Sequence, residues 1–168
     1  MKRIAITGPE STGKSTLAGQ LAEYYQTIWV PEFARDYIAE LNHQYTLQDL
    51  ENISRGQLEL IAQAEAKNPE YLIADTELLV LKIWSENAFG SCPAWILDEL
   101  KKQRFDLYLL MNIDLPWEPD PQREHPHLRQ YFFDLYKKEL EQLNFPYHII
   151  SGSDQERLQA AINAVEAV

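Results

Sequence analysis

One stretch near the amino terminus combines the residue types that bind phosphate groups. Residues 8–15 read Gly-Pro-Glu-Ser-Thr-Gly-Lys-Ser, followed by a threonine, and match the phosphate-binding pattern G-x-x-x-x-G-K-[ST]. The glycines permit a tight turn in which successive backbone N–H groups point at one anion. Lys14 can neutralise the β- and γ-phosphates of a nucleotide, and the Ser15 hydroxyl can bind Mg²⁺. The predicted nucleotide-binding residues are Gly8, Pro9, Glu10, Ser11, Thr12, Gly13, Lys14, Ser15 and Thr16.

The elements on either side of this loop are the ones that its chemistry requires. Residues 2–7 form a short run typical of a buried strand, and residues 15–26 place Leu17, Leu21 and Tyr24 at helical spacing. The amino terminus of a helix adds partial positive charge where the N–H groups of the loop converge. A strand, a loop and a helix in this order indicate a nucleoside triphosphate site with Mg²⁺ rather than an ordinary glycine turn.

Similar apolar runs recur along the chain and alternate with helical patterns. We expect strands at residues 4–7, 27–30, 71–74, 106–111 and 147–150. We expect helices at residues 15–26, 33–42, 46–68, 76–87, 93–102, 128–143 and 154–168, with a capping box of Thr46 and Asp49 at the start of the third. This alternation predicts a three-layer α/β fold, with helices on both faces of a parallel sheet, in one domain over residues 1–168.

Asp75 follows the apolar run at 71–74, at the predicted carboxyl end of a strand. Ligands collect at that edge of an open α/β sheet, and enzymes with a phosphate-binding loop place an aspartate there to hold Mg²⁺. An aspartate in this position can also cap the helix that follows, and the two roles can coexist. Ser15 and Asp75 are therefore the predicted metal ligands.

Charged residues of both signs follow the run at 27–30. Within a helix, Glu32, Arg35 and Asp36 would lie on one face, because they are three and four positions apart. Such a face can grip a hydroxylated substrate, and one of its carboxylates can orient or deprotonate an attacking hydroxyl. An ordinary ion pair on a solvated helix face fits the same spacing equally well.

A long proline-rich segment precedes the helix expected at 128–143. Residues 112–127 hold four prolines and little periodicity, with Arg123 inside the segment and Arg129 just beyond it. Long loops inside a compact domain are usually functional, and lids that close over phosphates carry such arginines. We expect a lid at about residues 113–130. A stiff surface loop with solvated arginines is the alternative.

Composition narrows the class of protein. The 168 residues carry a net charge of −11, which argues against a general binder of nucleic acids or membranes because both present anionic surfaces. The single cysteine, Cys92, excludes an internal disulfide and a multi-cysteine metal site. The sequence shows no signal peptide and no apolar run near the roughly 20 residues of a membrane helix. We therefore expect a cytoplasmic protein with a small-molecule substrate and no nucleic-acid or membrane partner.

Several of these features occur in one order that resembles a known family. They are the phosphate loop, Glu32-x-x-Arg35-Asp36-Tyr37, Gly56-Gln57, Asp75-Thr76, Phe105-Asp106-Leu107, and Pro116-Trp117 with Asp120, Arg123 and Arg129. Together they resemble the ribosylnicotinamide kinase domain of the NadR family, an AAA-type ATPase-like group of P-loop NTPases, from about Ile4 to Arg157. The loop alone is generic, whereas the Arg-Asp-Tyr block and the Pro-Trp lid are more specific.

This resemblance implies a reaction and a fold. The reaction is ATP-dependent phosphorylation of the 5′-hydroxyl of nicotinamide riboside to nicotinamide mononucleotide. The fold is a five-stranded parallel sheet in the nucleoside-kinase-like order 2-3-1-4-5, with the Asp75 strand beside the phosphate-loop strand.

The resemblance also implies roles for residues. Lys14 and the loop amides would hold ATP, Ser15 and Asp75 would hold Mg²⁺, and Arg123 and Arg129 would close over the phosphates. The expected substrate-binding residues are Glu32, Arg35, Asp36 and Tyr37, and the expected catalytic residues are Lys14, Asp36 and Arg123. In this scheme Asp36 orients the hydroxyl for in-line attack on the γ-phosphate.

The chain departs from the family in two respects. Pro31 stands where family members often carry an aromatic residue. Longer members also have a nucleotidyltransferase domain and a DNA-binding helix-turn-helix, so we expect neither adenylylation of the product nor a repressor role.

Two other functions fit the same sequence. The chain could phosphorylate another nucleoside or small metabolite, or it could be an ATP-hydrolysing switch without an acceptor. The D-x-x-G and N-K-x-D motifs of a GTPase are missing after the phosphate loop, which favours a kinase over a GTP switch.

Overall fold

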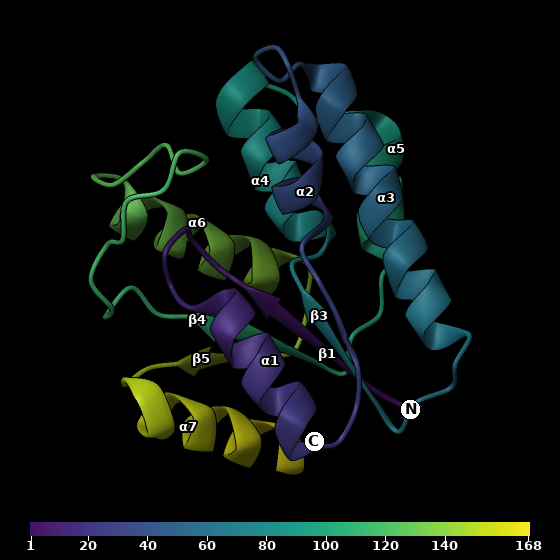
Figure 1. Ribbon diagram of the computed structural model, residues 1–168, viewed down its shortest axis with the longest axis vertical. Helices are drawn as coiled ribbons and strands as arrows, with labels where there is room; N and C mark the ends of the chain where they lie inside the picture. Colours follow the sequence, from purple (N-terminus) through teal and green to yellow (C-terminus); the bar gives the residue numbers. More distant parts are fainter.

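A parallel β-sheet lies at the centre of the computed structural model, which describes residues 1–168 (Figure 1). Its strands are β1 (Lys2–Thr7), β2 (Trp29–Val30), β3 (Tyr71–Asp75), β4 (Leu107–Met111) and β5 (Tyr147–Ile150). All neighbouring strands are parallel, in the order β2-β3-β1-β4-β5. The five-stranded sheet and its order are therefore confirmed, and the strand that ends at Asp75 lies beside the strand that leads into the phosphate loop.

Seven helices connect and cover these strands. They are α1 (Lys14–Tyr24), α2 (Phe33–Glu40), α3 (Leu47–Glu65), α4 (Leu78–Phe89), α5 (Ala94–Lys102), α6 (Arg129–Gln142) and α7 (Asp154–Glu166). Every expected helix is present, with boundaries that agree within three residues. The predicted capping box is also confirmed, because Thr46 and Asp49 exchange hydrogen bonds at the start of α3. None of these helices combines the length and the apolar character needed to cross a bilayer.

The helix expected from Thr76 begins two residues later, at Leu78. Glu77 is its N-cap, since the Glu77 carboxylate accepts a hydrogen bond from the backbone N–H of Leu79 at 2.7 Å. Thr76 instead has a φ of 76°, in the left-handed region that β-branched residues rarely adopt. The alternative in which Asp75 caps this helix is therefore wrong, and the Asp75 side chain is left for the site.

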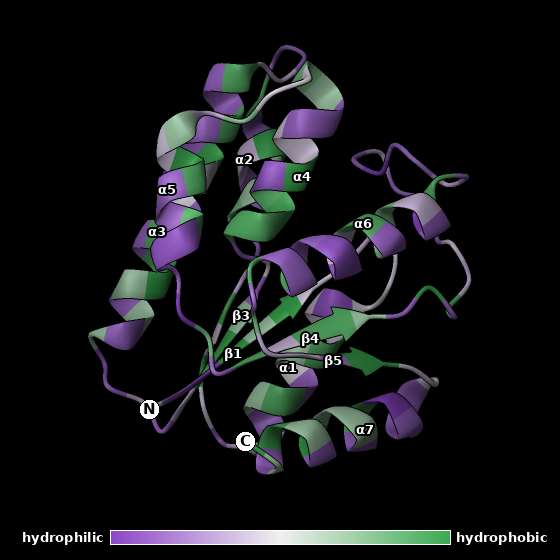
Figure 2. Ribbon diagram, turned by 180° about the vertical axis from the view of Figure 1, so that it is seen from behind, coloured by the Kyte–Doolittle hydropathy of each residue, from purple (hydrophilic) through white to green (hydrophobic).

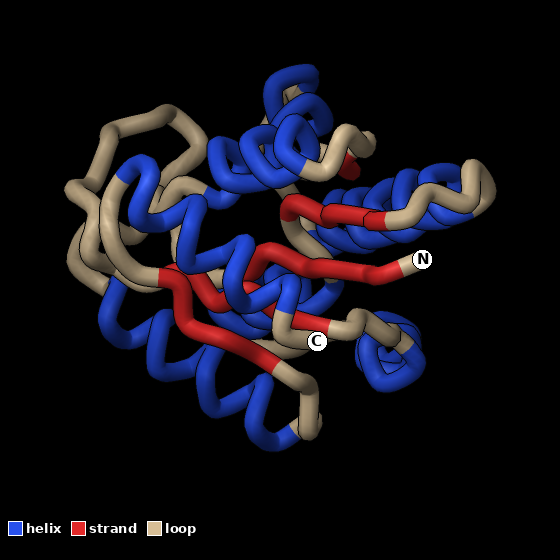
Figure 3. The backbone as a smooth tube through the Cα atoms, turned by 90° about the horizontal axis from the view of Figure 1, so that it is seen from below, coloured by secondary structure: helices blue, strands red, loops and turns tan.

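Alternation of side chains along the buried strands sorts the helices into two layers. Ile4 and Ile6 of β1 pack with Leu17 of α1 and Ile162 of α7. Ala5, between them, faces the opposite side, where apolar residues of α3, α4, α5 and α6 pack. Figure 2 shows the hydrophobic character of the strands, and Figure 3 shows the strands running between the two helical layers.

The carboxyl ends of four strands meet at one edge of the sheet. Ile6 lies opposite Asp75, and Val30 lies opposite Ala74, so β1, β2 and β3 end at nearly the same level. The segments that leave these strands are the phosphate loop, the start of α2, and the turn that leads into α4. The lid segment leaves β4 at the same edge. The topology therefore places the phosphate loop, Asp75, the start of α2 and the lid segment at the edge where parallel sheets bind ligands.

Gly56, on α3, predicts an unusual response to alanine. Alanine in place of glycine normally stabilises a helix by about 1 kcal/mol. At position 56 a Cβ would lie 2.3 Å from Cε1 of Phe33, so we expect Gly56→Ala to destabilise the fold by about 1–3 kcal/mol. Gly19→Ala, on α1 with no heavy atom within 4 Å of the added carbon, is the matched control and should be neutral or stabilising. Urea denaturation measures both, and equal gains in stability would contradict this packing.

Candidate active site

The loop between β1 and α1 has the backbone conformation of an anion cradle. Gly8, Ser11 and Gly13 have positive φ angles of 132°, 56° and 80°. Successive backbone N–H groups in such turns form concave sites that bind anions. At Gly8 a side chain would also be too close to the neighbouring strand, because a Cβ would lie 3.1 Å from the carbonyl oxygen of Met111. Gly13 is the N-cap of α1, so the positive end of the helix lies at the same point.

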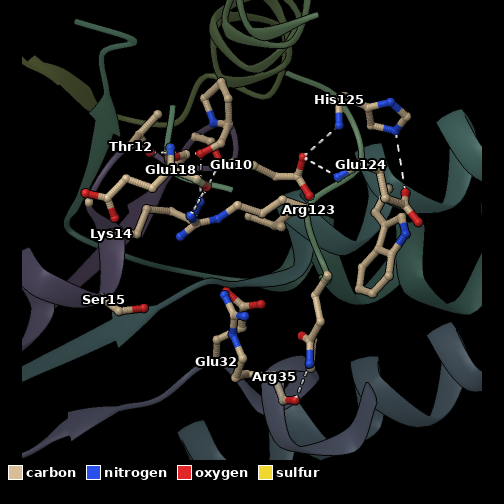
Figure 4. A pocket seen from close by; sticks show the side chains of 18 of the residues that line it. Glu10, Thr12, Lys14, Ser15, Glu32, Arg35, Glu118, Arg123, Glu124 and His125 are labelled. Atoms are coloured by element: carbon tan, nitrogen blue, oxygen red, sulfur yellow. Dashed lines mark hydrogen bonds and ion pairs between the residues drawn. The ribbon is translucent and has the colours of Figure 1, made fainter. Parts of the chain in front are cut away.

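The Lys14 side chain folds back onto the loop and bonds its main chain. Its Nζ donates hydrogen bonds to the carbonyl oxygens of Gly8 at 3.1 Å and Pro9 at 2.8 Å. Thr12 stabilises the same turn, because its hydroxyl donates to the Pro9 carbonyl at 2.8 Å. The ammonium group therefore lies at the loop and lines the cavity (Figure 4), in position to neutralise an anion at the loop.

Ser15 and Asp75 meet beside the cradle, as predicted for a metal site. The Ser15 hydroxyl donates to Oδ2 of Asp75 at 2.5 Å, while the buried Oδ1 of Asp75 has no hydrogen-bond partner. A hydroxyl, one carboxylate and phosphate oxygens form a donor set that suits Mg²⁺, which usually keeps several waters. The residues therefore fit Mg²⁺, and no cluster of three His, Cys, Asp or Glu side chains provides another metal site.

The electrostatics of Asp75 also fit a cation. Burial raises the pKa of Asp75 to about 6, although the hydrogen bond from Ser15 and the positive charge of Lys14 oppose this shift. Burial disfavours the ionised carboxylate because water no longer stabilises its charge. A divalent cation would supply the missing compensation and restore the ionised form.

The segment between β4 and α6 rests on the phosphate loop, as expected of a lid. Residues 112–128 form no helix or strand. The backbone N–H of Glu118 donates to the Ser11 hydroxyl at 2.8 Å. The backbone N–H of Glu124 donates to the carboxylate of Glu10 at 3.2 Å, and the next N–H along the chain donates to the same oxygen. Glu10 and Ser11 of the loop therefore hold the lid against it.

The two lid arginines have different environments. Arg123 lines the cavity, and its guanidinium donates to the carbonyl oxygen of Glu118 (Figure 4). Arg129 does not line the cavity, and it donates to the carbonyl oxygens of Leu115 at 2.8 Å and Ser11 at 3.1 Å. Arg123 is therefore in position to contact phosphates, whereas Arg129 joins the lid to the phosphate loop.

A buried arginine that sequence reasoning missed, Arg157 of α7, also lines the cavity. Its guanidinium donates to the carbonyl oxygens of Thr12 at 3.1 Å and Asn112 at 2.9 Å, and to the carboxylate of Asp114 at 2.9 Å. It therefore ties the phosphate loop to the base of the lid. The sequence did contain one indication of this role, because Arg157 is a basic residue on the apolar face of α7, four positions before the buried Ala161.

Two members of the charged block after β2, Glu32 and Arg35, line the cavity. The Glu32 carboxylate accepts a hydrogen bond from the Thr76 hydroxyl at 3.2 Å. Arg35 donates to both carboxylate oxygens of Asp120 at 2.9 and 2.8 Å, which forms an ion pair between α2 and the lid. Arg35 thus pairs with a residue 85 positions away rather than within its own helix.

The other two expected substrate-binding residues, Asp36 and Tyr37, do not line the cavity. Asp36 is exposed, and the Tyr37 hydroxyl donates to Asp49 of α3 at 2.8 Å. The expected shared face required Glu32 to be helical, but α2 begins at Phe33 and Glu32 is its extended N-cap. The structure therefore separates the predicted catalytic carboxylate, Asp36, from Glu32.

The part of the cavity between α2, α4 and α6 is largely aromatic and apolar. The whole cavity has a volume of about 690 Å³. Away from the phosphate loop it is lined by Tyr45, Val80, Ile83, Trp84, Phe132 and Tyr136. The rings of Tyr45 and Trp84 pack edge to face with centroids 5.1 Å apart. The structure thus selects Trp84, which the sequence did not distinguish from the other tryptophans.

Asp114 predicts a pH-dependent part of the stability. Burial alone would raise its pKa, but the hydrogen bond from the Gly152 amide and the Arg157 guanidinium outweigh burial and hold the pKa below its usual range. A lowered pKa stabilises the fold above the ordinary value of about 4, and this contribution is lost as the pH falls through the folded-state pKa. We expect Asp114→Asn to cost about 1–3 kcal/mol at neutral pH and progressively less in acid.

Urea denaturation at neutral and acidic pH measures this difference. Asp98→Asn, which removes an exposed partner of Lys101 at 3.9 Å, is the control and should change stability little at any pH. A cost of Asp114→Asn that is the same at both pH values would contradict the assignment.

Comparisons with known proteins show which family the chain belongs to. A family model described as an AAA domain matches residues 3–157. The Trifunctional NAD biosynthesis/regulator protein NadR of Escherichia coli (strain K12) is 27% identical over 162 residues, which cover 92% of this chain and 39% of that protein. The chain therefore spans about two fifths of the length of this relative.

Solved structures share the fold. A NadR protein in complex with NR has a TM-score of 0.77 at 22% identity, over 99% of this chain and 50% of that one, and its complex with NAD and AMP-PNP has a TM-score of 0.76. Deoxyadenosine kinase from M. mycoides has a TM-score of 0.67 at 14% identity, over 99% of this chain and 100% of that one. Because the family model spans nearly the whole chain, this protein belongs to the AAA domain family, and the resemblance to NadR that its motifs indicate is confirmed.

Proposed function

We propose that this protein is a kinase that transfers the γ-phosphoryl group of ATP to the 5′-hydroxyl of nicotinamide riboside. One observation carries the proposal. A single cavity runs from the anion cradle of the phosphate loop to the aromatic and apolar part between α2, α4 and α6, which we call the aromatic chamber. The Glu32 carboxylate lies on the wall of this cavity, close to Asp75. A nucleotide-hydrolysing switch needs the cradle but has no use for the second chamber. A phosphotransferase needs both, because donor and acceptor must be held in line.

The donor side of the cavity accounts for ATP. The loop amides and the amino terminus of α1 bind the phosphates, while Lys14 and Arg123 neutralise the charge that spreads over the transferring group. Ser15 and Asp75 would hold Mg²⁺, which would neutralise part of the phosphate charge. The lid contacts to Glu10 and Ser11 hold this segment against the loop, and closure of such a segment over bound nucleotide would favour transfer to the acceptor over hydrolysis.

On the acceptor side, Glu32 takes the role that the sequence suggested for Asp36. Glu32 lines the cavity at the edge of the sheet where Asp75 and Ser15 lie, whereas Asp36 is exposed. A carboxylate at this point can accept a hydrogen bond from the acceptor hydroxyl and orient it for in-line attack. The two buried carboxylates at this edge are already engaged, Asp75 with Ser15 and Glu77 with Thr7 and the start of α4.

The aromatic chamber suits a flat, cationic ring. The nicotinamide ring of the riboside carries a positive charge, which aromatic faces and carboxylates attract. Tyr45 and Trp84 supply the aromatic faces, and Glu10 and Glu124 line the same cavity. The likeness to NadR proteins, one of which was solved with NR, supports the same acceptor.

This proposal predicts a preference among acceptors. With ATP and Mg²⁺, the protein should convert nicotinamide riboside to a product heavier by one phosphate, with stoichiometric ADP. We expect kcat/KM for this acceptor to exceed that for neutral nucleosides such as adenosine, deoxyadenosine and thymidine by roughly 10-fold or more, because a neutral ring forfeits the charge interactions. Mass spectrometry and coupled ADP detection measure both. Faster turnover of a neutral nucleoside would contradict the acceptor, and hydrolysis of ATP without any phosphorylated acceptor would favour a switch.

Glu32→Gln and Asp36→Asn distinguish the two candidate carboxylates. Each replaces a carboxylate by an amide of nearly equal size. We expect Glu32→Gln to lower kcat by roughly 10²- to 10⁴-fold, as for the loss of a general base, with the KM for ATP nearly unchanged. Asp36→Asn should leave kcat within a few-fold of the wild type, because its side chain is outside the cavity. Steady-state kinetics settles the assignment, and the reverse pattern would return the role to Asp36.

A further inference from the structure

The position of Glu32 depends on residues that do not touch the cavity. An N-cap residue commonly bonds the first N–H groups of its own helix, as Thr46 does on α3 and Glu77 does on α4. Glu32 is the N-cap of α2, yet its side chain makes no capping hydrogen bond. Its carboxylate is therefore free to face the cavity, and the start of α2 needs another hydrogen-bond acceptor.

Gln57, on α3, supplies that acceptor. Its Oε1 accepts a hydrogen bond from the backbone N–H of Phe33 at 2.9 Å, and its Nε2 donates to the carbonyl oxygen of Pro31 at 3.2 Å. One side-chain amide thus bonds the peptide groups on both sides of Glu32. Gln57 is fully buried and does not line the cavity, so it acts on the backbone and not on a ligand. Gly56 leaves the space beside it that the Phe33 ring fills.

Thr76 binds the side-chain carboxylate of Glu32. Its hydroxyl donates to Oε2 of Glu32, and the Thr76 side chain is buried. The backbone N–H of Thr76 donates to the carbonyl oxygen of Ile6 at 3.1 Å, which fixes the main chain that carries the hydroxyl. The φ of 76° is unfavourable for a β-branched residue, and such strain persists where the surrounding structure imposes it, commonly at functional sites.

We propose that Gln57 and Thr76 are positioning residues for Glu32, because Gln57 fixes the backbone on both sides of it and Thr76 fixes its carboxylate. This inference rests on the proposed function, in which Glu32 orients the acceptor hydroxyl. Since both residues act through Glu32, they set the rate of phosphoryl transfer and leave the binding of ATP unaffected.

A double-mutant cycle tests this inference. Thr76→Val removes the hydroxyl with little change in shape, and Gln57→Met removes both backbone contacts. We expect each substitution to lower kcat by roughly 10- to 100-fold with the KM for ATP unchanged, as for a small displacement of a catalytic group. Thr76→Ser keeps the hydroxyl and should retain kcat within a few-fold. In a Glu32→Gln background the same substitutions should have little further effect, because the group that they position is already lost.

Ser54→Ala is the matched control on α3. The Ser54 hydroxyl is fully buried and donates to the Leu50 carbonyl of its own helix at 2.7 Å, so its loss perturbs the helix without touching Glu32. It should leave kcat unchanged, and thermal unfolding verifies that every variant is folded. If Gln57→Met does not fold, the cycle with Thr76→Val and the rescue by Thr76→Ser decide the question.

Two results would overturn the inference alone, given an active wild type. One is an unchanged kcat in Thr76→Val, and the other is a loss of equal size with and without Glu32→Gln. A wild type that phosphorylates no nucleoside would instead contradict the proposed function, and this inference with it. The activity of the wild type therefore separates the two kinds of failure.

Discussion

The turn of the chain from Gly8 to Lys14 is the constraint on which the rest of the structure depends. The left-handed φ of 56° at Ser11 is unfavourable for a residue with a side chain, so neighbouring elements must hold the loop. Met111 of β4 packs against Gly8, and Arg157 of α7 bonds the carbonyl oxygen of Thr12. Lys14 closes the turn from inside through the carbonyl of Pro9. Strand β4 and the last helix, α7, are thus needed together with β1 and α1 to form one anion site.

The same constraint explains how an acidic protein can hold a polyanion. The chain has a net charge of −11, yet Lys14, Arg123 and Arg157 all line the cavity beside the main-chain amides of the loop. Positive charge is therefore supplied locally, at the loop itself, although the chain as a whole is acidic. The lid connects the loop with α2, since it bonds the loop through Glu10 and pairs with α2 through Arg35. The lid segment therefore contacts both the donor and the acceptor part of the cavity.

Local sequence pattern predicted the layers and the donor side but not the acceptor side. Short apolar runs and helical spacing marked all five strands and seven helices, because their burial depends on neighbours in the sequence. The phosphate loop and Asp75 were predictable for the same reason. The orientation of the Glu32 side chain was not predictable, because it depends on hydrogen bonds that Gln57 of α3 supplies to the start of α2. Arg157 and Trp84 likewise reach the cavity only through contacts between distant segments.

Direct binding of the nucleotide tests the central claim, that the loop at residues 8–15 is a phosphate cradle completed by Lys14. Isothermal titration calorimetry with a non-hydrolysable ATP analogue and Mg²⁺ should show binding to the wild type. Lys14→Ala should weaken that binding by roughly 10-fold or more, because the β- and γ-phosphates lose their charged partner. Unchanged affinity in the folded variant would contradict the account, since the nucleotide would then bind elsewhere.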